Sequence, residues 1–405
     1  MPTILQINST ANSASTGRIA EQIGQLAINS GWDGYIAYGR SCNASQSNLI
    51  RIGNNKDIYI HGLCGLLFDN HGLSSTRATK DFVERIKTIA PDIIHLHNIH
   101  GYYVNYEILF EYLAESNVPV VWTLHDCWAY TGHCSYYSDI DCQKWQIHCN
   151  NCPKRHAYPK SLLLDRSTRN YQKKQQIFNS VKNLTLVPVS YWLEEEVRRS
   201  FLKDNHIRCI LNGVDVNSFH PTGGEQATRE KYGLNGKKVL LGVATAWGPR
   251  KGWNDYIRLS QTLSDDYQIV MVGVTEKQAK KLPKSILAIR RTENIEQLAD
   301  LYSMADVVLN LSDEESFGLT TAEGFACGTP SIVYNCTASP ELITPETGII
   351  IEKGDFEALV NAITTITNNG KDYYSANCRN RAVSYYDKDK NYKQYIELYK
   401  ELLHI

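Results

Sequence analysis

The chain has 405 residues, a formal net charge of -1 and a hydrophobic content of 42%. A chain of this length exceeds one ordinary hydrophobic core and favours two domains. The balanced charge argues against nucleic acid as the main partner, because proteins that bind nucleic acid usually carry a basic surplus. No apolar run is long enough to span a membrane.

The N-terminal residues 1–8 contain neither the charged segment nor the long apolar segment of a secretory signal. We therefore expect a first β-strand there and a cytoplasmic protein. In that compartment the 11 cysteines are expected to be mostly reduced or metal-bound.

Short β-branched runs alternate with amphipathic helical segments along the whole chain. We expect strands at residues 4–8, 35–38, 93–97, 119–124, 184–188, 207–211, 239–244, 268–272, 286–289, 307–311 and 331–334. The alternation predicts an α/β fold of two doubly wound parallel sheets. Such sheets bind ligands at the carboxyl ends of their strands, so two facing domains would share a cleft. We expect domains at 1–200 and 201–384, and a last helix at 385–405.

The first helix is expected to open at Ser15-Thr-Gly-Arg18, directly after the first strand. Gly17 either lets a backbone approach a phosphate or sugar closely, since a Cβ would fill that space, or is an ordinary glycine at a helix start. Arg18 beside it is a further candidate for a contact in the cleft.

Histidines gather at the ends of two strands of the first domain. His125 follows the apolar strand expected at residues 119–124. Its side chain therefore either projects into the cleft as a catalytic contact or is a satisfied core histidine. Asp126 either orients an acceptor hydroxyl or caps the following turn. His97 and His100 belong to a group of three histidines, and they are either packing residues or acceptor contacts.

Four cysteines lie within 19 residues of one another: Cys134, Cys142, Cys149 and Cys152. The Cys149-Asn-Asn-Cys152 spacing is typical of two zinc ligands, and two further thiolates would complete a closed tetrahedral site. His133 or Cys127 could replace a ligand. Such a site would staple a loop with little regular structure and would leave no open position for catalysis. Free thiols and disulfides are the alternatives.

Basic residues crowd the segment that follows: Lys154, Arg155, Lys160, Arg166, Arg169, Lys173 and Lys174. Leu162-Leu-Leu164 lies in its midst, and Asp165 is its only acid. This composition is typical either of a solvated helix face or of an amphipathic stretch that touches anionic lipid. The second possibility would suit a lipid-linked substrate.

In the second domain, Arg250-Lys251 follows a predicted strand, so both side chains can reach the ligand-binding edge of the sheet or form an exposed basic pair. Glu315 and Glu323 lie eight residues apart across a junction between a strand and a helix. Thr320 and Glu323 match a capping box, and Cys327-Gly-Thr-Pro330 predicts the helix end. The segment is either an ordinary capped helix or a helix N-terminus that binds phosphate between two carboxylates.

The segment with Glu315 and Glu323 resembles the E-x7-E signature of retaining glycosyltransferases of family 4, which have the two-domain GT-B fold. Other pieces stand in the family's order: Ser15–Arg18, His95–His97, His125–Asp126, Asn212–Asp215 and Pro249–Gly252. The resemblance covers nearly the whole chain, and it implies a last helix that packs back on the first domain. Residues 125–134 further resemble a subgroup that builds bacterial exopolysaccharide and capsule, as in colanic-acid-type transferases.

By resemblance the donor-binding residues are Gly17, Arg250, Lys251, Glu315, Phe317, Gly318, Leu319 and Glu323. Arg250 and Lys251 match the family's diphosphate-binding pair. Glu315 is expected to contact hydroxyls of the transferred sugar and Glu323 those of the ribose, while backbone amides at 317–319 hold phosphate or sugar oxygens. One departure is Thr245, where many relatives carry an arginine. Either Arg250 takes over that charge, or the diphosphate is held more weakly.

The resemblance implies a metal-independent retaining transferase that uses a nucleotide-diphospho-sugar, with UDP or GDP as the nucleotide. Its catalytic residues would be His125, Lys251 and Glu315, and its acceptor contacts His97 and Asp126. The acceptor would be a glycan or a polyprenyl-diphosphate-linked glycan in exopolysaccharide, capsule or O-antigen assembly, at the inner face of the plasma membrane. A sugar-nucleotide epimerase, or a non-catalytic nucleotide-sugar-binding or scaffolding protein on the same fold, is the alternative.

Overall fold

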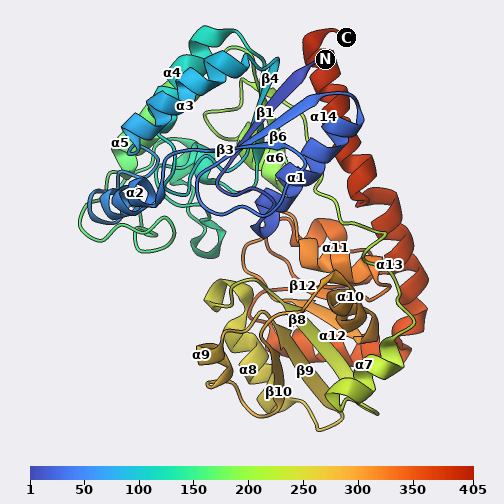
Figure 1. The fold of residues 1–405 in the computed structure, drawn as a ribbon. Coiled ribbons are helices and arrows are strands. Elements are labelled where there is room, and N and C mark those ends of the chain that lie inside the picture. The colour runs from blue at the N-terminus through green and yellow to red at the C-terminus, as the bar shows by residue number, and fades with distance from the viewer. The chain divides into compact units, whose positions relative to one another are not determined.

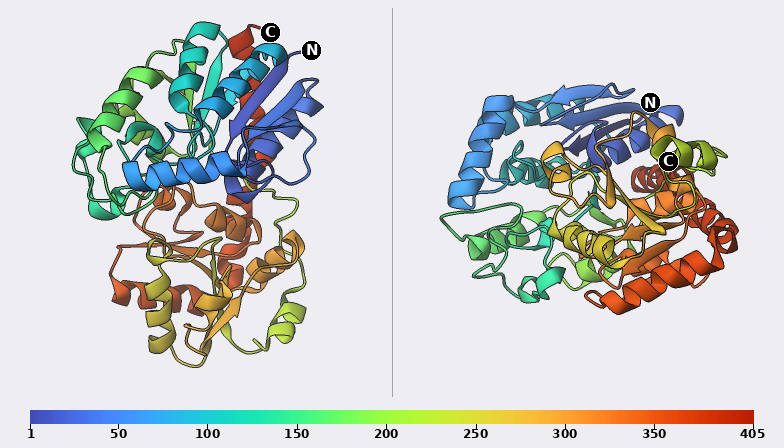
Figure 2. Two further views of the ribbon diagram at one scale, coloured as in Figure 1. Left: turned by 60° about the vertical axis from the view of Figure 1, so that its left-hand side comes forward. Right: turned by 90° about the horizontal axis from the view of Figure 1, so that it is seen from below.

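The computed structural model describes residues 1–405 and divides them into two compact units, each with its own parallel sheet. The first unit comprises Met1–Leu211 together with Tyr392–Ile405, and the second comprises Asn212–Asn391. Figure 1 labels most of the elements of both units, and helices lie on both sides of each sheet in Figures 1 and 2.

The first unit contains a seven-stranded sheet in the order β3-β2-β1-β4-β5-β6-β7. The strands are β1 (Thr3–Asn8), β2 (Asp33–Tyr38), β3 (Asn48–Arg51), β4 (Ile93–Leu96), β5 (Val120–Leu124), β6 (Leu184–Pro188) and β7 (His206–Ile207). The helices are α1 (Ala14–Asn29), α2 (Asn55–Phe68), α3 (Thr76–Ile89), α4 (Tyr106–Ser116), α5 (Ser167–Phe178) and α6 (Tyr191–Arg198). The last helix, α14 (Lys388–Leu403), belongs to this unit from Tyr392 onward.

The core of this unit forms because helices cover both faces of the sheet. β5 is buried along its whole length, as expected of a central parallel strand. Ile4 and Val121 of the sheet pack in one cluster with Ile23 of α1 and with Tyr395 and Tyr399 of α14. The last residues of the chain therefore belong to the first unit's core.

The second unit contains a six-stranded sheet in the order β10-β9-β8-β11-β12-β13. The strands are β8 (Lys238–Val243), β9 (Tyr267–Val272), β10 (Ile286–Ile289), β11 (Val307–Asn310), β12 (Ser331–Tyr334) and β13 (Gly348–Ile351). The helices are α7 (Glu225–Tyr232), α8 (Trp253–Thr262), α9 (Glu276–Ala279), α10 (Ile295–Met304), α11 (Leu319–Ala326), α12 (Phe356–Asn369) and α13 (Lys371–Tyr385).

The predicted α/β fold of two doubly wound parallel sheets is confirmed. Two strands, β3 and β13, were not predicted, and both are short strands at a sheet edge. The first unit runs to Leu211 and not to residue 200, because β7 pairs with β6. None of the helices is both long enough and apolar enough to cross a bilayer.

The predicted capping box at Thr320 and Glu323 is wrong. The residue before α11 is Gly318, whose φ of 103° favours glycine, and no side chain caps this N-terminus. Glu323 instead lies within the helix. The helix end is as predicted, since α11 stops at Ala326 and Gly328 follows with a φ of 74°.

Candidate active site

The candidate site of the second unit lies in the loops after β8 and β11. These strands are neighbours at the point where the strand order reverses, and doubly wound sheets bind ligands at such a point. The first loop contains Thr245, which is exposed, and a 3-10 helix at Pro249–Lys251. The Arg250 guanidinium donates to the carbonyl of Glu314 at 2.9 Å, and the amide of Asp313 donates to the carbonyl of Arg250 at 2.9 Å. Arg250 therefore ties the two loops together.

Lys251 and Glu315 form an ion pair across these loops. Burial raises the pKa of Glu315, but the charge and hydrogen bond of Lys251, aided by the charge of Arg250, lower it more, so the pKa lies below its ordinary value. The amide of Glu315 also donates to Oγ1 of Thr337 at 2.8 Å, which fixes the backbone there. The site thus holds a carboxylate and an ammonium group side by side.

The N-terminus of α11 adds hydrogen-bond donors next to this pair. Leu319 and Thr320 are the first two helical residues, and the amides at such positions have no partner within a helix. A helix start with free amides favours a bound anion. Phe317 is buried with its ring centroid 5.7 Å from that of Tyr386, so its side chain anchors the turn that presents the amides.

Glu323 lies about one turn further into α11 and is partly buried. Its Oε2 accepts a hydrogen bond of 2.7 Å from the hydroxyl of Tyr302 in α10. Burial, and then the nearby charge of Glu323, raise the pKa of Tyr302 well above its ordinary value, so Tyr302 remains a donor. Tyr302 orients the carboxylate, and no sequence pattern pointed to it.

In the first unit, His125 follows β5 and is only 7% exposed. Its Nε2 lies 3.1 Å from Nδ1 of His97, and Nε2 of His97 lies 3.0 Å from Oε1 of Gln6. The side-chain nitrogen of Gln6 donates to the carbonyl of Ala20 at 2.8 Å, and this bond sets the orientation of the Gln6 amide.

These contacts determine which ring nitrogens carry protons. Because Oε1 of Gln6 only accepts, neutral His97 carries its proton on Nε2, and its Nδ1 accepts. His125 then donates from Nε2, which leaves its own Nδ1 as a proton acceptor. Burial lowers the pKa of His125 to about 4 and that of His97 below its ordinary value, so both rings are neutral at pH 7.

Other polar residues of this region have structural partners. His95 is a satisfied core histidine, bonded to Thr123 at 2.8 Å and to the hydroxyl of Tyr399 at 2.7 Å. His100 lies 2.9 Å from the carboxylate of Asp126, which also accepts from the amide two residues on and so caps the turn after β5. Burial raises the pKa of Asp126, but His100 and that cap lower it more, and the carboxylate stays ionised.

Gly17 lies in the first turn of α1, where an added Cβ would meet Oγ1 of Thr10 at 2.5 Å. The amide of Asn12 donates to the carbonyl of Gly17 at 3.0 Å. Glycine is therefore required here because the β1–α1 loop packs closely against the start of its own helix. Arg18, the next residue, is exposed.

The four clustered cysteines line one cavity of about 20 Å³: Cys134, Cys142, Cys149 and Cys152. None forms a disulfide, and the amide of Gly132 donates to Sγ of Cys149 at 3.3 Å. A hydrogen bond from Cys134 is the main cause that lowers the pKa of Cys152 to about 7, against the effect of burial. No group of three or more His, Cys, Asp or Glu side chains in the structure is arranged to hold a metal ion.

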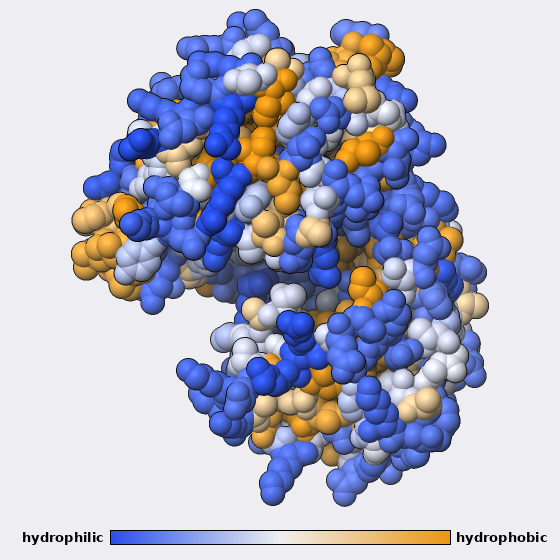
Figure 3. All heavy atoms as spheres, viewed as in Figure 1, coloured by the Kyte–Doolittle hydropathy of each residue, from blue (hydrophilic) through white to orange (hydrophobic).

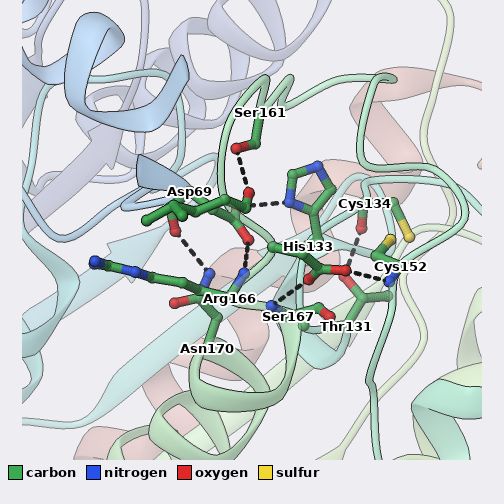
Figure 4. A network of polar contacts seen from close by, with 12 residues as sticks. Asp69, Thr131, His133, Cys134, Cys152, Ser161, Arg166, Ser167 and Asn170 are labelled. Atoms are coloured by element: carbon green, nitrogen blue, oxygen red, sulfur yellow. Dashed lines mark hydrogen bonds and ion pairs between the residues drawn. The ribbon is translucent and has the colours of Figure 1, made fainter. Parts of the chain in front are cut away.

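Figure 4 shows the polar network beside these cysteines. Nδ1 of His133 lies 2.6 Å from Oδ1 of Asp69, and Oδ2 of Asp69 accepts from the amide of Arg166 at 2.7 Å. Asp69 is the C-cap of α2. The network therefore fastens the end of α2 to the segment that carries the cysteines and to the start of α5.

Comparison with known proteins agrees with this geometry. Residues 224–385 match the family described as Glycosyl transferases group 1, and residues 35–218 match Glycosyltransferase Family 4. The fold and these matches define a GT-B glycosyltransferase. The chain belongs to the family 4 type of these enzymes, because the two matched regions together span most of the length of the chain.

Three curated relatives have informative names. The chain is 22% identical over 280 residues to the colanic acid biosynthesis glycosyl transferase WcaC of Escherichia coli K12, covering 68% of this chain and 67% of that one. It is 29% identical over 191 residues to a GDP-mannose-dependent phosphatidylinositol monomannoside mannosyltransferase of Corynebacterium glutamicum, covering 43% and 50%. A 41.2 kDa protein of the cps region of Klebsiella pneumoniae is 22% identical, covering 95% and 96%. The chain thus spans about half to two thirds of the first two relatives.

Solved structures share the fold over the whole chain. Sucrose-phosphate synthase from Thermosynechococcus elongatus superposes with a TM-score of 0.73 at 18% identity, covering 100% of both chains. HepE of Anabaena, solved with UDP and glucose, gives a TM-score of 0.66 at 14% identity, covering 99% of this chain and 100% of that one.

Proposed function

We propose that this glycosyltransferase moves a sugar, with retention of configuration, from a nucleotide-diphospho-sugar to a glycan or lipid-linked glycan. The observation that carries the proposal is the Lys251–Glu315 ion pair beside the N-terminus of α11. A cation and free helix amides suit a diphosphate, whereas a carboxylate suits sugar hydroxyls. Glu323, held by Tyr302, is proposed to bind the ribose.

In the proposed reaction, the bond between the sugar C1 and the phosphate oxygen breaks, and the leaving diphosphate keeps the electron pair. The acceptor oxygen bonds to C1 on the same face, and its proton passes to an oxygen of the leaving phosphate. Lys251 and the amides at the start of α11 would stabilise the charge that grows on the diphosphate, so this step requires no metal. Arg250 supports Lys251 by fixing the loop.

His125 is proposed to contact the acceptor or the transferred sugar. Its neutral ring offers Nδ1 as a hydrogen-bond acceptor, which suits a sugar hydroxyl. Asp126 and His97 would act through His125 and the turn after β5, because their own polar atoms are engaged. Gly17 is proposed to keep the β1–α1 loop close to its helix.

The relatives suggest the substrates. A GDP-mannose-dependent relative and a fold neighbour solved with UDP support UDP or GDP as the nucleotide. WcaC and the protein of a cps region support a role in exopolysaccharide, capsule or O-antigen assembly. We propose a cytoplasmic site of action at the inner face of the plasma membrane, where a lipid-linked acceptor would lie.

Turnover of the donor tests this proposal. A panel of UDP- and GDP-sugars is screened by thermal shift, since a ligand of the folded state raises the melting temperature. The donor that binds is then incubated alone, and the expected result is slow release of free sugar that disappears in Lys251→Ala and Glu315→Ala. Donor binding without any release of sugar, with or without added glycan, would favour a binding protein.

We also propose a structural zinc ion for the four cysteines. In its favour, the four thiols line one cavity. Burial raises the pKa of Cys149 to about 12, although the backbone N–H that its Sγ accepts acts against this, so a bound cation would be needed to hold the thiolate. A closed site of this kind would hold the loop together without taking part in catalysis. Elemental analysis of protein purified without chelator should find zinc that is lost in Cys149→Ser and retained in Cys42→Ser, which alters an exposed cysteine. Equal zinc in both variants would contradict the site.

A further inference from the structure

An apolar surface lies over α2 of the first unit. From Ile58 to Phe68 this helix contains no Asp, Glu, Lys or Arg. Four of its large side chains are exposed: Tyr59 (75%), Ile60 (56%), Leu63 (43%) and Phe68 (45%). Soluble helices normally turn polar residues outward, so a helix that exposes these side chains marks an interaction surface.

A second apolar segment, Leu162–Leu164, adjoins this helix. The amide of Leu162 donates to the carbonyl of Leu66 at 2.7 Å, which places the segment against the end of α2. Its three leucines are 42%, 63% and 40% exposed. We name the exposed side chains of α2 and of Leu162–Leu164 the leucine patch. Figure 3 shows apolar atoms gathered at the margin of the molecule where α2 lies in Figure 1.

The charge around the leucine patch is basic. Lys56, Lys160 and Arg166 flank it in the sequence, and the first two are exposed. Two carboxylates also lie here and keep their charge while they accept backbone hydrogen bonds: Asp57 in the capping box of α2, and Asp165 from two amides. The basic residues on the flanks therefore exceed the acids by one charge.

Several basic residues of the 154–174 segment do not join this surface. Lys173 pairs with Glu107, and Lys174 is buried with its ammonium bonded to the carbonyls of Trp128 and Thr131. Lys154 pairs with Asp139 at 2.5 Å. The charge of the surface therefore comes from its flanks and not from the segment as a whole.

We propose that the leucine patch docks the first unit onto an anionic lipid bilayer. Aromatic and aliphatic side chains that project from a surface helix insert into the headgroup boundary, while flanking lysines and arginines attract anionic lipid. The exposed leucines suit a deformable lipid surface, and the basic residues on the flanks of the patch favour an anionic bilayer over an apolar protein partner. The inference deepens the proposed function, since it places the acceptor-binding unit where lipid-linked glycans occur.

Vesicle flotation tests the proposal with the full chain. Vesicles of phosphatidylcholine and phosphatidylglycerol in equal parts are compared with phosphatidylcholine alone. Wild type should float with the anionic vesicles, and Tyr59→Ser with Ile60→Ser should lower the ratio of bound to free protein about tenfold or more. The matched control is Tyr373→Ser with Tyr385→Ser, two tyrosines of α13 that are 67% and 59% exposed.

A charge series separates the two contributions. Lys56→Glu with Lys160→Glu should weaken binding to anionic vesicles, while Lys277→Glu with Lys281→Glu, of equal net charge, should not. The melting temperature of each variant is measured to check that it is folded. Equal flotation of the α2 variant and wild type would overturn the proposal. A wild type that is dimeric and an α2 variant that is monomeric would also overturn it, because the patch would then be a protein interface. No sugar donor is present, so the outcome is independent of whether the chain transfers sugar.

Discussion

His97 provides a direct test of how the first unit prepares His125. Replacing His97 by leucine removes the atom that accepts from Nε2–H of His125 and leaves that donor buried. His125 then either keeps an unsatisfied N–H or moves its proton to Nδ1, which abolishes the acceptor that we propose for a sugar hydroxyl. Asparagine at position 97 is the matched control, because Oδ1 of asparagine stands close to where Nδ1 of histidine stood and can still accept.

The expected size follows from the cost of a buried, unpaired donor, about 1–3 kcal/mol. At about 1.4 kcal/mol per factor of ten, kcat/KM for the donor should fall by about 5- to 150-fold in His97→Leu. In His97→Asn the fall in kcat/KM should stay below about fivefold, which corresponds to the free energy of at most one net hydrogen bond.

Two measurements check this prediction. Donor turnover gives kcat/KM, and long-range nitrogen–proton NMR of the labelled histidines reports which nitrogen of His125 carries the proton. Wild type and His97→Asn should both show Nε2–H on His125. Nδ1–H on His125 of the wild type, or equal loss of activity in the leucine and asparagine variants, would refute this role of His97.

Three further outcomes are expected. Tyr302→Phe removes the donor that orients Glu323, so KM for the donor should rise severalfold with kcat nearly unchanged, and an unchanged KM would argue against a ribose contact. His61 and His125 each have a pKa lowered from 6.5 to about 4 by burial, so both are neutral when folded and resist protonation. The contribution of these neutral histidines to the free energy of unfolding should be fully present above pH 6.5. It should fall by about 3 kcal/mol for each histidine as the pH drops to 4, which urea titrations at several pH values will show. Gly252→Ala should cost about 2 kcal/mol or more in urea unfolding, because φ is 71° and a Cβ would lie 2.4 Å from a carbonyl oxygen of the loop after β11.

Much of the fold could be predicted from the sequence because buried parallel strands read as short apolar runs. β5 illustrates this, since all of its residues are apolar or β-branched and all are buried. β3 was missed because an exposed edge strand with Asn48 and Arg51 at its ends has no such signal. Its pairing depends on the neighbouring strand β2, which local sequence does not reveal.

The residues of the candidate site could be proposed from motifs, but their partners could not. The Thr320–Glu323 pattern indicated a cap, whereas the turn at Gly318 decides where α11 begins. Gln6 is a polar residue in an apolar strand, which was a usable signal for a buried hydrogen bond to His97. Tyr302 gave no signal, because only the packing of α10 beside α11 brings it to Glu323.

The central claim is that Lys251 holds the diphosphate and Glu315 the transferred sugar of one donor. Calorimetric titration of the intact nucleotide sugar and of the free nucleoside diphosphate measures both contacts. Lys251→Met should weaken both ligands by about tenfold or more, as expected for loss of a charged contact. Glu315→Gln should weaken the nucleotide sugar alone, and Lys353→Met, which removes a neighbouring ion pair with Asp313, should change neither. Unaltered binding of the nucleoside diphosphate to Lys251→Met would contradict the account.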